Sequence, residues 1–110
     1  MSLGNQRPAE RRSKPRMVCN YPAYVRGKNE EGKNFEEPAR VINMSSGGVY
    51  LLLNRAIPSG EELSIRIAMP TGSLDLGSSK LATNGTVVRG EAKTKGIFGI
   101  AVKFNSYRFV

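Results

Sequence analysis

Polar and apolar residues alternate along several stretches of the chain. The clearest stretch is residues 63–68, where Leu63, Ile65 and Ile67 are separated by a serine and an arginine. This period of two predicts a β-strand with one buried face. Five further stretches are rich in β-branched, aromatic or other apolar residues and are bounded by turn-forming segments; they are residues 17–26, 35–44, 48–54, 81–92 and 97–104. Six short strands at a spacing of roughly 8–12 residues predict an all-β barrel or sandwich.

Local irregularities are predicted within these strands. Pro22 and Pro38 each remove a backbone donor, which favours a bend or a position at the edge of the sheet. Gly85 lies inside the long stretch 81–92 and predicts a bulge. No segment has the periodicity of a helix.

The first residues of the chain differ from the rest in composition. They are polar and basic, contain prolines, and offer almost nothing to bury, which is typical of a flexible arm. The polar and basic stretch runs to Arg16 and forms the arm; we expect its residues 1–10 to be disordered, and residues 1–3 are compatible with a vector remnant. Residues 11–110 form the single predicted domain, a size at which one hydrophobic core is sufficient.

Composition excludes several kinds of chemistry. The chain has no histidine and one cysteine, Cys19, so neither a transition-metal site nor an intrachain disulfide is expected. Its nine acidic residues occur partly as adjacent pairs, whose side chains point to opposite faces of a strand and do not form a catalytic dyad. We therefore expect no enzyme, no catalytic residue and no cofactor. No apolar run approaches the ~20 residues needed to span a bilayer, and without a signal peptide we expect a cytoplasmic protein.

Charge indicates the kind of partner. The formal net charge is +8 and the isoelectric point is near 10.1, which favours an anionic partner such as a nucleic acid, a nucleotide or a membrane surface.

Two short motifs narrow this choice of partner. Arg11, Arg12 and Arg16 cluster at the end of the arm, and guanidinium groups match both phosphate oxygens and the edge of guanine. Taken alone, such a run is more commonly a solvated basic tail.

The second motif is the small-residue run that interrupts the apolar sequence around residue 46. Asn43 and Ser45 are two positions apart, so they are predicted to project from the same face of a strand. Gly47 and Gly48 lack side chains and leave space in which a flat ring could approach the backbone. Taken alone, this run is more commonly a tight turn.

Together the two motifs resemble the PilZ domain family. The pair Arg12 and Arg16 fits the family's R-x-x-x-R pattern, and Asn43, Ser45 and Gly48 fit its D/N-x-S-x-x-G pattern. The stretches MVCNYPAYV, VINMSSGGVYL and GIAVKF are similar to the family's first strand, its corner between the second and third strands, and its last strand. The resemblance extends over roughly residues 11–104.

The resemblance implies a six-stranded antiparallel β-barrel that binds the bacterial second messenger cyclic di-GMP. It implies that Arg12 and Arg16 clamp guanine edges and phosphates, and that Asn43, Ser45 and Gly48 form the opposing wall. Ordering of the arm on the ligand would be the signal, read by a downstream protein or a fused domain.

Other arginines are weaker candidates. In related domains an arginine at the position of Arg11 is associated with a stacked pair of ligand molecules, so Arg11 is included among the expected ligand-binding residues. Arg40 and Arg89 could also reach the mouth of the barrel, although an exposed strand arginine is the preferred interpretation of both.

Two alternatives to a nucleotide receptor stay open. One is a PilZ-like adaptor that binds only protein partners, which the presence of the arginines disfavours. The other is a small barrel that binds single-stranded DNA or RNA, which the low aromatic content of 7% and the absence of tryptophan disfavour. One departure from the family is also evident, because the helix that commonly follows the last strand has no counterpart in residues 105–110.

Overall fold

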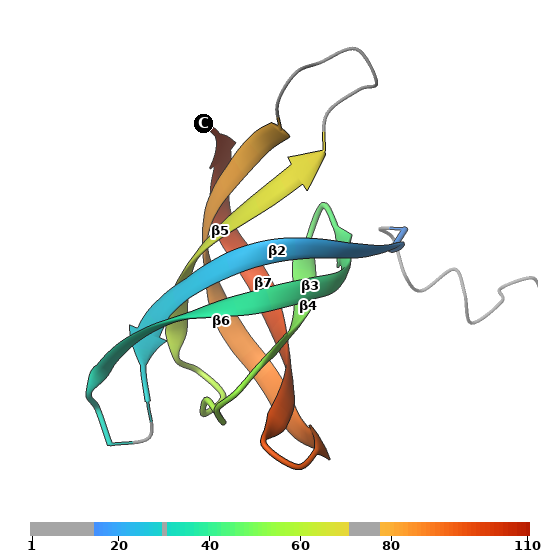
Figure 1. Cartoon of the computed structure of the whole chain (residues 1–110). Coiled ribbons are helices and arrows are strands. Elements are labelled where there is room, and N and C mark those ends of the chain that lie inside the picture. The colour runs from blue at the N-terminus through green and yellow to red at the C-terminus, as the bar shows by residue number, and fades with distance from the viewer. Residues whose placement is uncertain (1–14, 30, 71–77) are drawn as a thin grey trace, which may run out of the picture.

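Strands make up most of the described chain. The computed structural model describes residues 15–29, 31–70 and 78–110. It contains six strands: β2 (Met17–Lys28), β3 (Asn34–Ser45), β4 (Gly48–Leu53), β5 (Glu62–Pro70), β6 (Ser78–Thr94) and β7 (Ile97–Phe109) (Figure 1). Within these three ranges there is no helix, and therefore none long and apolar enough to cross a membrane. The predicted all-β class is confirmed.

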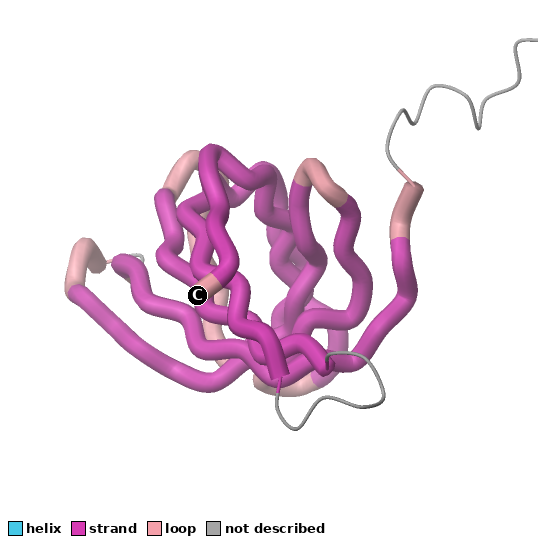
Figure 2. Tube along the Cα trace, turned by 90° about the horizontal axis from the view of Figure 1, so that it is seen from above, coloured by secondary structure: helices cyan, strands magenta, loops and turns pink. Residues whose placement is uncertain are grey.

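The strands close into a ring, which is seen from above in Figure 2. Their order is β2-β3-β4-β7-β6-β5, with every neighbouring pair antiparallel. Closure comes from the pairing of β2 with β5, which spans only residues 23–26 of β2. The predicted antiparallel barrel is thus confirmed, and the sandwich alternative is not.

The core consists of the inward-facing residues of all six strands, which alternate with outward-facing ones as predicted. The most fully buried large side chains are Val25, Val41, Leu51, Leu63, Ile65, Ile67, Val87 and Ile100. Burial of each such side chain contributes roughly 1.5–3 kcal/mol to folding. Alternation is strictest in β5, the strand in which the sequence pattern is clearest.

The strands are longer than the short strands that the sequence predicts. β6 has 17 residues and β7 has 13, and β7 continues past Phe104 to Phe109. The sequence predicts that this strand ends at Phe104. Instead, the segment after Phe104 pairs with the first half of β6, in register from Asn84 opposite Ser106 to Leu81 opposite Phe109.

Both prolines lie where their strand is paired on one side only. Pro22 is opposite Arg40 of β3, but pairing of β2 with β5 begins one residue later, at Ala23. Pro38 pairs with β2, but pairing of β3 with β4 begins at Arg40. A missing N–H therefore costs no ladder hydrogen bond on the open side, in agreement with the predicted local edges. A register shift lies between Asn84 and Gly85, but the extra residue is Asn105 of β7, so the bulge is in the partner strand and not at Gly85.

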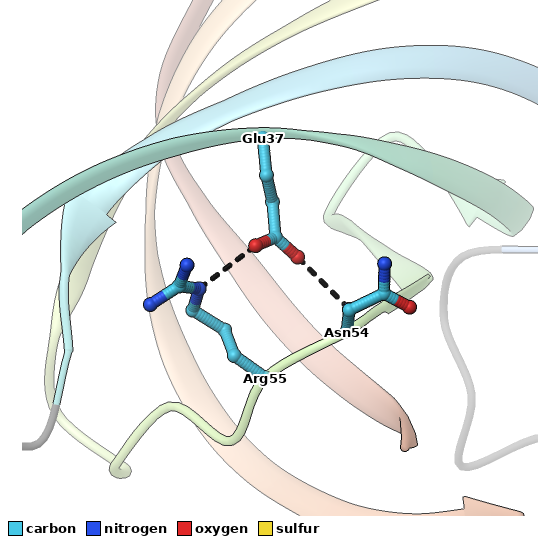
Figure 3. Close-up of polar contacts among 3 residues, drawn as sticks. All are labelled: Glu37, Asn54 and Arg55. Atoms are coloured by element: carbon cyan, nitrogen blue, oxygen red, sulfur yellow. Dashed lines mark hydrogen bonds and ion pairs between the residues drawn. The ribbon is translucent and has the colours of Figure 1, made fainter.

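The connection from β4 to β5 packs against the barrel core through Ile57, which is 4% exposed. Glu37 fixes the start of this connection by accepting hydrogen bonds from the backbone N–H of Asn54 and from Nε of Arg55, both at 2.8 Å (Figure 3). The Arg55 guanidinium also lies 4.4 Å from the centre of the Phe35 ring. Because Glu37 is partly buried and paired, this contact holds the loop more firmly than a surface ion pair would.

Candidate functional site

A cavity of about 190 Å³ on the outer surface of the ring brings the two sequence motifs together. Arg16, Asn43, Ser45 and Gly48 all line it, and they are the four predicted ligand-binding residues that fall within the described chain. Nη1 of Arg16 donates a hydrogen bond of 3.0 Å to Oδ1 of Asn43. The other two predicted residues, Arg11 and Arg12, lie outside the described residues.

Register across four strands places the side chains of this site. One row runs from Asn43 in β3 through Tyr50 and Ala101 to Arg89 in β6. The neighbouring row runs through Ser45, Gly48, Lys103 and Thr86, one from each of the same strands; these pairings follow from the same registers. Residues directly opposite on antiparallel strands share a face of the sheet. The small residues therefore lie between walls formed by β3 and β6.

A bulge in each outer wall turns the key side chain outward. In β3, Val41 pairs with Leu51 and Asn43 pairs with Tyr50, so Ile42 is an extra residue. Val41 is fully buried, and without the extra residue Asn43 would point into the core as well. The bulge thus places Asn43 in the cavity wall.

The bulge in β6 has the same effect on Arg89. Val87 is buried opposite Val102, and Arg89 pairs with Ala101, so Val88 is the extra residue. A regular strand would direct Arg89 inward, like Val87 two residues before it. Instead, Arg89 lines the cavity opposite Arg16 and Asn43.

The turn between β3 and β4 is compact. It consists of Ser46 and Gly47, and the Gly47 N–H donates a 3.1 Å hydrogen bond to the Ser45 hydroxyl. The carbonyl oxygen of Gly47 accepts a 2.9 Å hydrogen bond from the Phe104 N–H of β7. A side chain at Gly48 would collide with the backbone carbonyl oxygen of Val102. The motif glycine therefore has a packing role, because it allows β4 and β7 to approach.

The cavity has a positive electrostatic character. Arg16, Arg89 and Lys103 line it, and none of the described lining residues is acidic. Asn43 and Ser45 add neutral hydrogen-bonding groups beside these cations. An arrangement of this kind suits a ligand with phosphate groups and hydrogen-bonding bases. Within the described residues no group of three or more histidine, cysteine or carboxylate side chains is placed to hold a metal ion.

Tyr50 forms the floor next to Arg89. Its ring covers Gly99, where a side chain would collide with the ring, and its hydroxyl donates a 2.5 Å hydrogen bond to Oε2 of Glu91. Burial, reinforced by this hydrogen bond, raises the pKa of Tyr50, although the charge of Arg89 acts in the opposite direction. The same hydrogen bond, together with the nearby charge of Lys93, lowers the pKa of Glu91.

A pH dependence of stability follows from this pair. The lowered pKa of Glu91 contributes stability that is present above its unfolded value, near 4.5, and is lost as the pH falls through the folded value. The raised pKa of Tyr50 contributes stability that is complete below about 10 and is lost as the pH rises through the folded value. The stability difference between wild type and Tyr50→Phe should therefore be largest between these limits and shrink below pH 4.5. Urea unfolding of both proteins across this range measures it, and a difference independent of pH would contradict the assignment.

Three residues of the site were not predicted as ligand-binding from the sequence. Tyr50 and Lys103 carried no motif signal, and Arg89 was preferred as an ordinary exposed strand arginine. Their places depend on the pairing of β4 with β7 and on the bulge in β6, which a single sequence does not reveal. Arg40, the other weak candidate, does not line the cavity.

A closed antiparallel ring with a cationic surface cavity defines a small β-barrel domain with a candidate site for an anionic ligand. A family model described as the PilZ domain matches residues 10–108, and the chain therefore belongs to the PilZ domain family. PilZ domains are in general receptors for cyclic di-GMP and not enzymes.

A solved structure shares the fold. The chain is similar to the inhibitor of motility MotI/DgrA of Bacillus subtilis, with a TM-score of 0.68 and 21% sequence identity. The match covers 87% of this chain and 43% of the other, so the chain corresponds to less than half of that protein's length. No curated protein sequence matches the chain.

Proposed function

We propose that this domain is a non-enzymatic receptor that binds cyclic di-GMP in the cavity between β3 and β6. The observation that carries the proposal is the Arg16–Asn43 hydrogen bond, because it joins the R-x-x-x-R motif to the N-x-S-x-x-G motif at one cavity. Membership of the PilZ family supports the choice of ligand.

Each side of the cavity has a role in this proposal. Arg16 binds a guanine edge or a phosphate, and Asn43 and Ser45 supply hydrogen bonds from the opposing wall. Arg89 and Lys103 place positive charge on the far side, where a second phosphate of a dianionic ligand would lie. Charge-assisted hydrogen bonds of this type are stronger than neutral ones.

The cavity is small for its proposed ligand. Its volume of about 190 Å³ is below the ~300–1,000 Å³ that is common for small-molecule sites. The proposal therefore requires the arm, with Arg11 and Arg12, to complete the site around the ligand. Ordering of the arm costs free energy that the arginine contacts must exceed, and the ordered arm is the signal for a downstream protein or fused domain. An intracellular messenger as ligand implies action in the cytoplasm.

Isothermal titration of the domain with cyclic di-GMP, with GTP as the control nucleotide, tests the proposal. Selective binding of cyclic di-GMP supports it, and two ligands per chain would support a role for Arg11 in binding a stacked pair. One ligand per chain would contradict that role. Absence of binding would overturn the receptor function and favour the protein-binding adaptor.

Replacing Arg89 by alanine should weaken cyclic di-GMP binding by about tenfold, which corresponds to the lower end of the roughly 1.5–3 kcal/mol that a hydrogen bond to a charged group contributes. Arg89→Lys keeps the charge without the planar fork, so it should recover part of the affinity. Titration of both variants measures the effect. Unchanged affinity in Arg89→Ala would remove β6 from the proposed site.

A further inference from the structure

A second hollow lies on the outer face of β5, β6 and β7, and it shares no lining residue with the cyclic di-GMP cavity. Its volume is about 340 Å³. Two cross-strand rows form its floor and sides. One row is Arg66, Ala82 and Arg108, and the other is Ser64, Asn84 and Ser106.

The first row places two guanidinium groups around a small residue. Arg66 and Arg108 lie on strands that flank β6, so their backbones are roughly 10 Å apart, twice the spacing of neighbouring strands. Ala82 lies between them and leaves space above the sheet. Both arginines are exposed, and their long side chains can converge on one anionic group or on two neighbouring ones.

These arginines differ from Arg26 and Arg55 in their surroundings. Arg26 pairs with Glu36 and Arg55 pairs with Glu37, whereas neither Arg66 nor Arg108 has an ion pair with any residue that the structure describes. The described residues that line the hollow include no carboxylate. Among the described residues, the positive charge of this face is therefore not neutralised by a carboxylate.

The second row indicates what kind of group lies beside the anion. Asn84 carries both a donor and an acceptor, and the hydroxyls of Ser64 and Ser106 can each donate or accept. A peptide backbone also offers donors and acceptors, whereas a phosphate group offers acceptors alone. This row therefore suits the backbone of an extended peptide, whose carboxylate side chains would reach the two arginines.

Nucleic acid fits the hollow less well. Among the described lining residues the one aromatic residue is Tyr107, and its ring packs against Phe104 with the centroids 5.4 Å apart. Tyr107 lies opposite the buried Thr83 and alternates with Ser106 and Arg108, so its side chain belongs to the other face of the sheet. It therefore does not form a stacking platform beside the two arginines, which single-stranded nucleic acids require of most binding proteins.

We propose that the hollow between Arg66 and Arg108 is a docking site for an acidic peptide segment of a partner protein. The carboxylates bind the two guanidinium groups, and Asn84 with the flanking serines binds the peptide backbone. This site goes beyond the receptor function and does not depend on it, because its residues are separate from those of the nucleotide cavity.

Fluorescence anisotropy with a labelled decapeptide containing four glutamates in a Gly-Ser background tests this proposal. A matched glutamine peptide and an oligothymidylate of equal length are the competing probes. The test variant is Arg66→Gln with Arg108→Gln. The matched control is Lys33→Gln with Lys95→Gln, which removes the same charge from two hairpin turns.

The expected result is binding of the glutamate peptide in preference to both other probes. The arginine double variant should lose at least tenfold in affinity and the lysine double variant less than twofold. Equal losses in the two variants would show that net charge alone is responsible and would overturn the site. Absence of peptide binding, or tighter binding of the oligonucleotide, would also overturn it. Unchanged cyclic di-GMP titration and thermal unfolding of the arginine variant separate this result from misfolding and from failure of the receptor proposal.

Discussion

Replacing Arg16 by alanine is expected to weaken cyclic di-GMP binding at least tenfold. Arg16 lies immediately before β2 and its guanidinium already contacts the Asn43 side chain. Loss of a bidentate guanine contact costs roughly 1–3 kcal/mol, and 1.4 kcal/mol corresponds to tenfold in affinity. The loss should be larger than for Arg89→Ala, because Arg16 also links the arm to the wall formed by β3. Isothermal titration at fixed ionic strength measures it.

Arg40→Ala is the matched control for this experiment. Arg40 is an exposed arginine of β3 that does not line the cavity. Its removal therefore changes the net charge by the same amount as Arg16→Ala but leaves the cavity wall intact. We expect its affinity to stay within twofold of wild type. A double-mutant cycle with Asn43→Ala then measures the coupling between the two motifs. If Arg16→Ala and Arg40→Ala bind equally well, the proposed role of Arg16 is wrong.

Replacing Gly48 by alanine is expected to destabilise the barrel by about 2–3 kcal/mol, at the upper end of the usual cost of overpacking. The added methyl group would collide with the Val102 carbonyl oxygen, which belongs to the backbone of β7 and cannot rotate away. Separation of β4 from β7 would be needed to relieve the collision. Urea unfolding monitored by circular dichroism gives the change in free energy of unfolding.

Gly90→Ala is the comparison for this substitution. A methyl group at Gly90 would meet the end of the Ile100 side chain at 3.1 Å, and that flexible group can move by a few tenths of an ångström. We expect a distinctly smaller loss of stability there. Equal effects at the two positions would show that the collision at Gly48 is relieved at little cost. These stabilities must be measured before a loss of ligand binding in Gly48→Ala is interpreted, because destabilisation of the barrel would itself weaken binding.

The ring of six strands could be predicted because its sequence signals are local. In β5, buried and exposed residues alternate as strictly as the apolar and polar residues do. The extent of β7 could not be predicted in the same way. Residues 106–109 are held by pairing with residues 81–84 of β6, and this contact between distant segments leaves no periodic signal in either one.

The residues of the candidate site also differ in whether the local sequence could predict their positions. Asn43 and Ser45 could be placed on one face from their spacing, and the motif linked them to Arg16, 27 residues away from Asn43. Arg89 could not be placed, because its direction depends on the extra residue Val88 in β6. A bulge shifts every following side chain to the other face, so alternation read through it assigns the wrong side.

β7 pairs with β4 on one side and β6 on the other, and it also carries Lys103 in the wall of the cavity. The cavity is therefore incomplete until the last strand has been synthesised and has bridged two hairpins. The long segment that separates β4 from β7 in the sequence closes slowly, because its conformational entropy must be lost before the contacts between the two strands form. During synthesis the earlier strands can pair while the chain is still growing, but the cavity proposed for the messenger has to wait for β7. A domain built in this order does not offer its proposed ligand site before β7 has paired with both of its neighbours.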